Sequence, residues 1–272
     1  MKHIPYGHQQ IDKGDIASVV RILKSDWLTQ GPAAGVFERA IAQYCGAKFA
    51  VAVSSGTAAL HAAYLAVDIG KGDEVIMSPL TFAATANMAV FSGARPVFAD
   101  IREDTLNIDP GEVERRITKK TRAIMAVDFA GHPCEYTELL RIAKKHALLL
   151  LEDAAHALGA MYQGKKIGGI ADVTTFSFHP VKAITTGEGG MVVTNQKKFA
   201  EAARTFRTHG IQRKSEKEPW YYEIEEPGFN YRITDIQAAL GLSQLKKLNR
   251  FIGRRRKLVR QYGQLLKGVE GL

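Results

Sequence analysis

The stretch 149–190 reads LLLEDAAHALGAMYQGKKIGGIADVTTFSFHPVKAITTGEGG, and the rest of the sequence is interpreted around it. An apolar run typical of a buried strand ends in Asp153. A second strand-like run ends in Ser177, shortly before Lys182, and a glycine-rich turn closes the stretch. Pro180 rules out regular helix or central-strand pairing around Lys182. An acid and a lysine therefore each stand just past the end of a core strand.

Strand and helix patterns alternate around this stretch. Apolar runs typical of buried strands cover 49–53, 74–77, 95–99, 123–127, 147–151, 173–178 and 190–194. Helical patterns cover 12–25, 35–44, 58–67, 82–91, 110–117, 136–146 and, as one or two long helices, 234–267. This alternation predicts an α/β fold with a mostly parallel central sheet flanked by helices on both faces. The short connection between the last two strands allows part of the sheet to be antiparallel.

Composition indicates an ordinary globular protein, because 272 residues with 46% hydrophobic and 24% charged side chains match the usual balance. No stretch approaches the roughly 20 apolar residues of a membrane span. The N-terminus has no apolar segment typical of a secretion signal. We therefore expect a cytoplasmic protein without a membrane partner. Cys45 and Cys134 are expected to be reduced thiols, and no metal site is predicted.

The formal net charge is +9, and much of the excess lies late in the chain. A basic surface can bind nucleic acid, but the apolar residues between these charges recur at helical spacing, which favours a solvated helix face. No nucleic-acid motif accompanies the charge, so no specific nucleic-acid partner is expected. Attraction of an anionic small substrate is a further interpretation. The basic residues are Lys246, Lys247, Arg250, Arg254, Arg255, Arg256, Lys257, Arg260 and Lys267.

The segment Ser54-Ser55-Gly56-Thr57 lies between a predicted strand and a predicted helix. Unpaired N–H groups and the positive dipole end of a helix start can hold a phosphate, and glycine lets the backbone approach closely. The alternative is an ordinary helix cap, for which Ser and Thr are common. Because ligands bind beyond the carboxyl ends of such strands, this segment, Asp128, Asp153 and Lys182 converge on one sheet edge.

An acid and a lysine near a phosphate site suit pyridoxal 5′-phosphate chemistry. A lysine amine can form a Schiff base with the aldehyde of this cofactor. A carboxylate paired with the pyridine nitrogen keeps the nitrogen protonated, which makes the ring an electron sink. Taken singly, Lys182 is more often a surface lysine and Asp153 a helix cap. Their common place at one sheet edge favours the functional interpretation.

Several segments resemble the DegT/DnrJ/EryC1/StrS family of sugar aminotransferases. The resemblance extends from about residue 27 to 245, and its motifs are specific. It implies the aspartate-aminotransferase-like fold of pyridoxal-phosphate transferases, fold type I. The organisation it implies is an N-terminal arm (1–30), a large cofactor domain (31–235) and a long helix (236–272) leading into a small C-terminal domain that we expect to be truncated. The segments that carry it are 54–60, 152–156, 177–182, 186–190 and 228–232.

The resemblance also implies residue roles. Lys182 would bind the cofactor aldehyde and move the proton, and Asp153 would bind the ring nitrogen. His156 would lie near the ring hydroxyl and Phe82 would stack on the ring, although the alternatives are a structural histidine and a core aromatic. The phosphate would be held by Ser55, Gly56, Thr57, Ser177 and, from a neighbouring subunit, Asn230, which implies a homodimer with shared sites. Substrate contacts are assigned to Thr29, Gln30 and Gly31.

The implied reaction moves an amino group from L-glutamate to C4 of a nucleotide-linked sugar. Residues 127–134 and 220–223 resemble family members of pseudaminic acid biosynthesis, which act on a UDP-linked 4-keto-6-deoxy-N-acetylhexosamine. Some members carry His in place of the lysine and dehydrate sugars, so Lys182 favours amino transfer. Two alternatives stay open: another UDP- or dTDP-linked keto-sugar or a cyclitol, and an inactive fragment. The sequence speaks against a cofactor-binding regulatory protein, because no helix-turn-helix segment is appended and Lys182 is intact.

Overall fold

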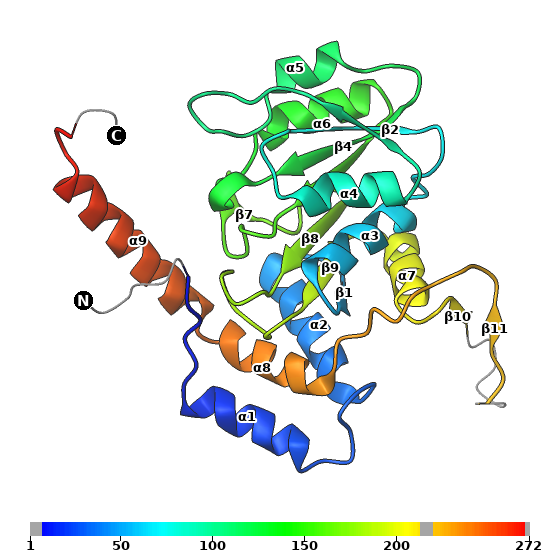
Figure 1. The fold of residues 1–272 in the computed structure, drawn as a ribbon, viewed down its shortest axis with the longest axis vertical. Coiled ribbons are helices and arrows are strands. Elements are labelled where there is room, and N and C mark those ends of the chain that lie inside the picture. The colour runs from blue at the N-terminus through cyan, green and yellow to red at the C-terminus, as the bar shows by residue number, and fades with distance from the viewer. Residues whose placement is uncertain (1–6, 213–219, 270–272) are drawn as a thin grey trace.

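The computed structural model describes residues 7–212 and 220–269 (Figure 1). Its main sheet has seven strands in the order β1-β9-β8-β5-β4-β2-β3. β9 is antiparallel to β1 and β8, and every other neighbouring pair is parallel. The predicted fold class is therefore confirmed. The strands are β1 (Phe49–Val53), β2 (Glu74–Met77), β3 (Arg95–Phe98), β4 (Thr121–Val127), β5 (Leu149–Asp153), β8 (Val173–Ser177) and β9 (Gly190–Thr194).

Helices cover both faces of this sheet because its strands alternate apolar side chains between two cores. One core receives α3 (Gly56–Ala66), α4 (Ala83–Phe91) and α7 (Lys197–Phe206). The other receives α2 (Pro32–Cys45), α5 (Pro110–Arg115), α6 (Tyr136–Lys145) and α8 (Asp235–Leu245). Two short hairpins complete the described strands: β6 (Met161–Tyr162) with β7 (Lys165–Lys166), and β10 (Ile211–Gln212) with β11 (Glu223–Ile224).

α1 (Lys13–Leu23) packs on α8, and α9 (Leu248–Leu265) projects away from the sheet (Figure 1). Asp15 of α1 is fully buried and accepts hydrogen bonds from Lys247 and from Gln244 at 2.8 Å. Its pKa is lowered because these bonds outweigh the cost of burial. This contact holds the N-terminal helix against the junction of α8 and α9.

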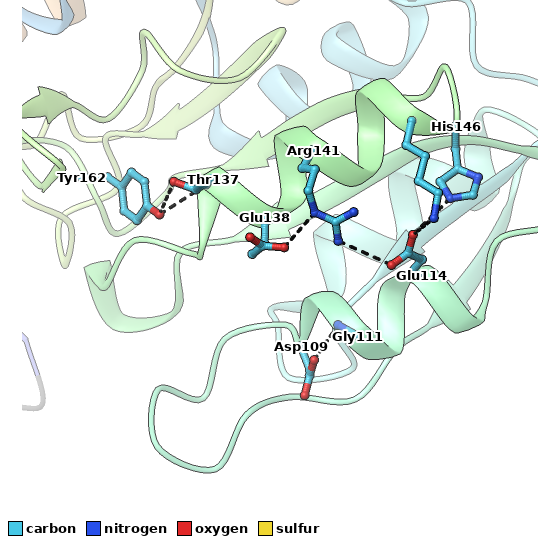
Figure 2. Close-up of polar contacts among 9 residues, drawn as sticks. Asp109, Gly111, Glu114, Thr137, Glu138, Arg141, His146 and Tyr162 are labelled. Carbon is cyan, nitrogen blue, oxygen red and sulfur yellow. Dashed lines mark hydrogen bonds and ion pairs between the residues drawn. The ribbon is translucent and has the colours of Figure 1, made fainter.

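Glu114 joins α5 to α6 at the surface (Figure 2). Its carboxylate pairs with Lys145 at 2.7 Å, His146 at 3.4 Å and Arg141 at 3.5 Å. These partners, Lys145 first, lower the pKa of Glu114 to about 2. The same figure shows Tyr162 of β6, whose hydroxyl lies 2.9 Å from that of Thr137.

The structure differs from the sequence prediction at β5 and at α7. The strand predicted at 147–151 begins at Leu149 and ends at Asp153. Ala147 has a left-handed φ of 53°, so it cannot continue the strand backward, and Asp153 is the last strand residue rather than the one beyond it. α7 was not predicted, although Phe199, Ala203 and Phe206 recur at helical spacing and are buried.

No helix in the described part of the chain is both long and apolar enough to cross a membrane.

Candidate active site

Three segments meet at the carboxyl-end edge of the sheet. Asp153 ends β5, Ser177 ends β8, and α3 begins directly after β1. The turn at the start of α3 lies against β8, because a Cβ added to Gly56 would lie 2.8 Å from Cβ of Ser177. Only glycine fits there without displacing the serine. The predicted phosphate-binding segment at residues 54–57, called the cradle below, therefore forms one surface with Ser177.

Asp153 is 6% exposed, and its carboxylate is held by two donors. The side-chain hydroxyl of Thr85 donates to Oδ2 at 2.7 Å, and the backbone N–H of Ala155 donates to Oδ1 at 3.2 Å. The hydroxyl of Thr81 lies 2.8 Å from that of Thr85. Sequence reasoning missed both threonines. No local pattern marks Thr85, because Asp153, the residue that it contacts, lies 68 positions away in the chain.

Lys182 is half-buried in the loop after β8, where its N–H donates to the carbonyl of His179 at 2.9 Å. Burial lowers the pKa of its amine, and the charge of Asp153 partly offsets this. Burial, reinforced by the charge of Lys182, also lowers the pKa of His156, while Asp153 acts in the opposite direction. The structure thus brings together the acid, the amine and the imidazole that the sequence predicted.

The start of α3 serves both as a helix cap and as a candidate phosphate site, the two interpretations of residues 54–57. Ser55 is the N-cap, and its hydroxyl accepts from the N–H of Ala58 at 3.1 Å. The next N–H groups, on Gly56 and Thr57, have no carbonyl inside the helix to accept them. They are the part of the turn suited to a phosphate. Ser55 therefore shapes the cradle as a cap, as the alternative interpretation stated.

Phe82 and Asn230 are both exposed side chains. Phe82 is 77% exposed at the N-cap of α4, so the interpretation of this residue as a core aromatic is wrong. Asn230 lies on the segment before α8 and pairs through its backbone with Thr208. The neighbouring carbonyl of Tyr231 accepts from the N–H of Ser54 at 2.8 Å, which ties this segment to the cradle.

Of the predicted substrate residues Thr29, Gln30 and Gly31, the first and the last contact the start of α8. Thr29 forms a bridge with Thr234, and the N–H of Gly31 donates to Asp235 at 2.8 Å. Gly31 is also the N-cap of α2. Among the described residues, these contacts give the segment a structural role and do not join it to Lys182.

A second buried polar group lies on the opposite face of β5 from Asp153. Tyr136 is fully buried, and its hydroxyl lies 2.7 Å from Oδ1 of Asp128 and 2.5 Å from Oε1 of Glu152. Burial and the charge of Glu152 raise the pKa of Asp128 well above its ordinary value. Burial also raises the pKa of Glu152. The tyrosine has one hydrogen for two acids, so a second proton must reside on the pair.

The residues at this edge fit a cofactor with three recognisable parts. The buried carboxylate of Asp153 suits a protonated ring nitrogen, and the amine of Lys182 suits an aldehyde. The free N–H groups of Gly56 and Thr57 suit a phosphate. The exposed ring of Phe82 offers a face for stacking. Fold and site together define an enzyme of the pyridoxal-phosphate class.

Comparison with known proteins identifies the family. The DegT/DnrJ/EryC1/StrS aminotransferase family matches residues 9–272, and the chain belongs to this family. The UDP-4-amino-4,6-dideoxy-N-acetyl-beta-L-altrosamine transaminase of Campylobacter jejuni (strain 81-176) is 45% identical over 262 residues, which cover 95% of this chain and 68% of the relative. The protein is thus a sugar aminotransferase that depends on pyridoxal phosphate.

Two solved structures agree with this assignment. Helicobacter pylori PseC, an aminotransferase of pseudaminic acid biosynthesis, matches with a TM-score of 0.95 and 39% identity, covering 99% of this chain and 72% of that one. The pyridoxal-phosphate form of the putative sugar aminotransferase Spr1654 from Streptococcus pneumoniae matches with a TM-score of 0.92 and 33% identity, covering 97% and 72%. The predicted cofactor is confirmed at the level of the family.

Proposed function

We propose that the protein transfers an amino group from L-glutamate to C4 of a UDP-linked 4-keto-6-deoxy-N-acetylhexosamine. The observation that carries the reaction type is a half-buried Lys182 amine, of lowered pKa, within the electrostatic influence of the buried carboxylate of Asp153. The similarity to the Campylobacter jejuni transaminase, whose name specifies an N-acetylated 4-amino sugar linked to UDP, supports the choice of substrate.

Each site residue has a task that its surroundings allow. Lys182 binds the cofactor aldehyde and later moves the proton at the reacting carbon, for which a lowered pKa is favourable near neutral pH. Asp153, oriented by Thr85, keeps the ring nitrogen protonated. Gly56 and Thr57 hold the phosphate, Ser177 lies beside them, and the cofactor supplies the electron sink for amino transfer.

The active unit in this proposal is a homodimer. Asn230 is exposed, yet its segment is tied to the cradle through the carbonyl of Tyr231. We infer that this exposed amide, on a segment fixed at the site edge, binds the phosphate held by a second copy of the chain. Asn230→Ala is then expected to weaken cofactor binding, whereas a monomeric enzyme would not depend on it. The domain limits at 30 and 235 and the cytoplasmic location stay predictions.

Single-turnover amination tests the substrate. The enzyme is loaded with cofactor, converted to its amino form by glutamate, and freed of excess donor. UDP-, dTDP- and GDP-linked 4-keto sugars and a keto-cyclitol are then added one at a time. We expect the visible absorbance of the aldehyde form to return fastest with the UDP-linked N-acetylated sugar, and the product to be its 4-amine.

Two controls make the result decisive. Lys182→Ala should give no turnover and no mass increase on the peptide containing residue 182 after borohydride reduction. Glutamine or aspartate in place of glutamate should convert the enzyme more slowly. Faster turnover of a cyclitol or of a dTDP-linked sugar would overturn the proposed substrate, and failure to bind the cofactor would overturn the proposed function.

A further inference from the structure

A large cavity lies between the Lys182 loop and α9. Its volume is about 890 Å³, which is in the range that accommodates a large small-molecule ligand. His156 and Lys182 line one side, and Arg255, Arg256 and Arg260 of α9 line the other. The cavity therefore adjoins the amine that reacts, yet most of its charged wall belongs to a helix with no part in cofactor binding.

The charged side chains that line the cavity are all basic. No aspartate or glutamate lines it in the described part of the chain. Within residues 7–212 and 220–269, neither Arg256 nor Arg260 forms an ion pair. Clustered positive charges without counter-charges repel one another. An anion bound among them therefore reduces this electrostatic repulsion and also accepts hydrogen bonds from the arginines.

The arginines have different tasks. Arg255 donates to the carbonyls of Lys182 at 3.0 Å and Ala183 at 3.1 Å, which fixes α9 against the lysine loop. Arg256 and Arg260 are four residues apart, so they lie on one side of α9. Their guanidinium groups are planar forks of donors that suit phosphate oxygens. Ile252 and Val259 of the same helix add an apolar wall beside them.

We infer that Arg256 and Arg260 bind the diphosphate of a nucleoside-diphosphate-linked substrate in this cavity. The inference rests on the proposed function and names the residues that would select its substrate class. The diphosphate carries two negative charges that meet two unpaired cations, while the sugar extends toward Lys182. If the substrate bound in the opposite orientation, with its diphosphate at the start of α3, it would compete with the phosphate of the cofactor for Gly56 and Thr57.

Calorimetric titration of the cofactor-loaded enzyme with UDP, UMP and uridine tests the site without any turnover. We expect UDP to bind more tightly than UMP and uridine to bind weakest. Arg256→Gln and Arg260→Gln should each raise the Kd for UDP about 10-fold or more, because each removes a charge-assisted hydrogen bond. Lys257→Gln is the matched control, since it removes the same charge from α9 at a residue outside the cavity.

The outcomes separate the inference from the proposed function. Equal UDP affinity in the wild type and both arginine variants would overturn the site. So would an equal loss in Lys257→Gln, which would reveal attraction by the whole helix, or binding of uridine as tight as that of UDP. With a reactive keto-sugar, the arginine variants should raise KM much more than they lower kcat. If UDP binds as expected but no nucleotide-linked keto-sugar is aminated, the proposed function fails and the anion site stands.

Discussion

The hydroxyl of Thr85 donates to Oδ2 of Asp153 at 2.7 Å, joining the first turn of α4 to the last residue of β5. A hydroxyl has one hydrogen, so Thr85 must accept the hydrogen bond that it shares with Thr81 at 2.8 Å. Both bonds fix the direction in which the buried carboxylate points. Asp153 is thus oriented by a helix that begins beside Phe82, the exposed aromatic expected to cover the ring.

Thr85→Val removes this donor while nearly preserving shape. A hydrogen bond to a charged group contributes about 1.5–3 kcal/mol, so we expect the affinity for pyridoxal phosphate to fall roughly 10- to 100-fold. The rate of the glutamate half-reaction should also fall, because the carboxylate is less well oriented toward the ring nitrogen. Absorbance titration of the cofactor-free enzyme measures the first effect, and stopped-flow absorbance the second.

Thr81→Val is the matched control for that substitution. It removes the outer hydroxyl and leaves the bond from Thr85 to Asp153 in place. Its loss of cofactor affinity should therefore be smaller than that of Thr85→Val. Equal losses in both variants would contradict a specific role for Thr85 and would indicate a general disturbance of the α4 start.

The parts of the site that the sequence predicted are those with a local signal. Asp153 and Lys182 stand beside strand ends that apolar runs predict, and Gly56 stands at a strand-to-helix turn. Thr85 could not be assigned in this way, because its partner lies 68 residues away and only the sheet order brings them together. For the basic helix, the sequence favoured a solvated face and offered attraction of an anionic substrate, but it could not show which arginines of α9 line a cavity beside Lys182.

The fold shows the same division. Periodicity predicted the seven strands of the main sheet, but it did not give their order or the reversal of β9. The error at β5 arose because Ala147 and Leu148 extend the apolar run, whereas the left-handed φ of Ala147 breaks the strand. Short hairpins such as β6–β7 bury few apolar side chains, so no apolar run in the sequence predicts them.

The lowered pKa of Lys182 predicts a pH dependence of stability in the cofactor-free enzyme. The folded pKa lies below the unfolded value, so between the two the unfolded chain binds more protons and stability rises with pH. Lys182→Met removes this group. At neutral pH the variant should have a higher Tm than the wild type, because it lacks a half-buried charged amine. This difference in Tm should shrink as pH rises toward 10.5, the ordinary pKa of lysine. Differential scanning fluorimetry measures both Tm values across this pH range, and a constant difference would contradict the lowered pKa.

Tyr136→Phe removes the single hydroxyl between Asp128 and Glu152 and leaves two buried acids short of a partner. Unsatisfied buried polar groups cost about 1–3 kcal/mol each, so the loss for the two acids should be roughly 2–6 kcal/mol. For a chain of this size that corresponds to a fall in Tm of about 4–24 °C. Tyr162→Phe is the control, because its hydroxyl bonds Thr137 at the surface (Figure 2). A smaller fall in Tyr136→Phe than in the control would contradict the buried network.

Glu114→Gln should destabilise the protein in a pH-dependent way, because the partners of Glu114 lower its pKa from 4.5 to about 2. A carboxylate with a depressed folded pKa contributes stability that is fully present above its unfolded pKa and is lost as pH falls through the folded value. The Tm difference between wild type and variant should therefore be largest near pH 7, shrink below pH 4.5 and vanish only once the pH falls below about 2. Glu138→Gln, which removes one exposed partner of Arg141, should lower Tm less. A Tm difference that persists unchanged at low pH would show that Glu114 stabilises the α5–α6 contact by packing rather than by charge.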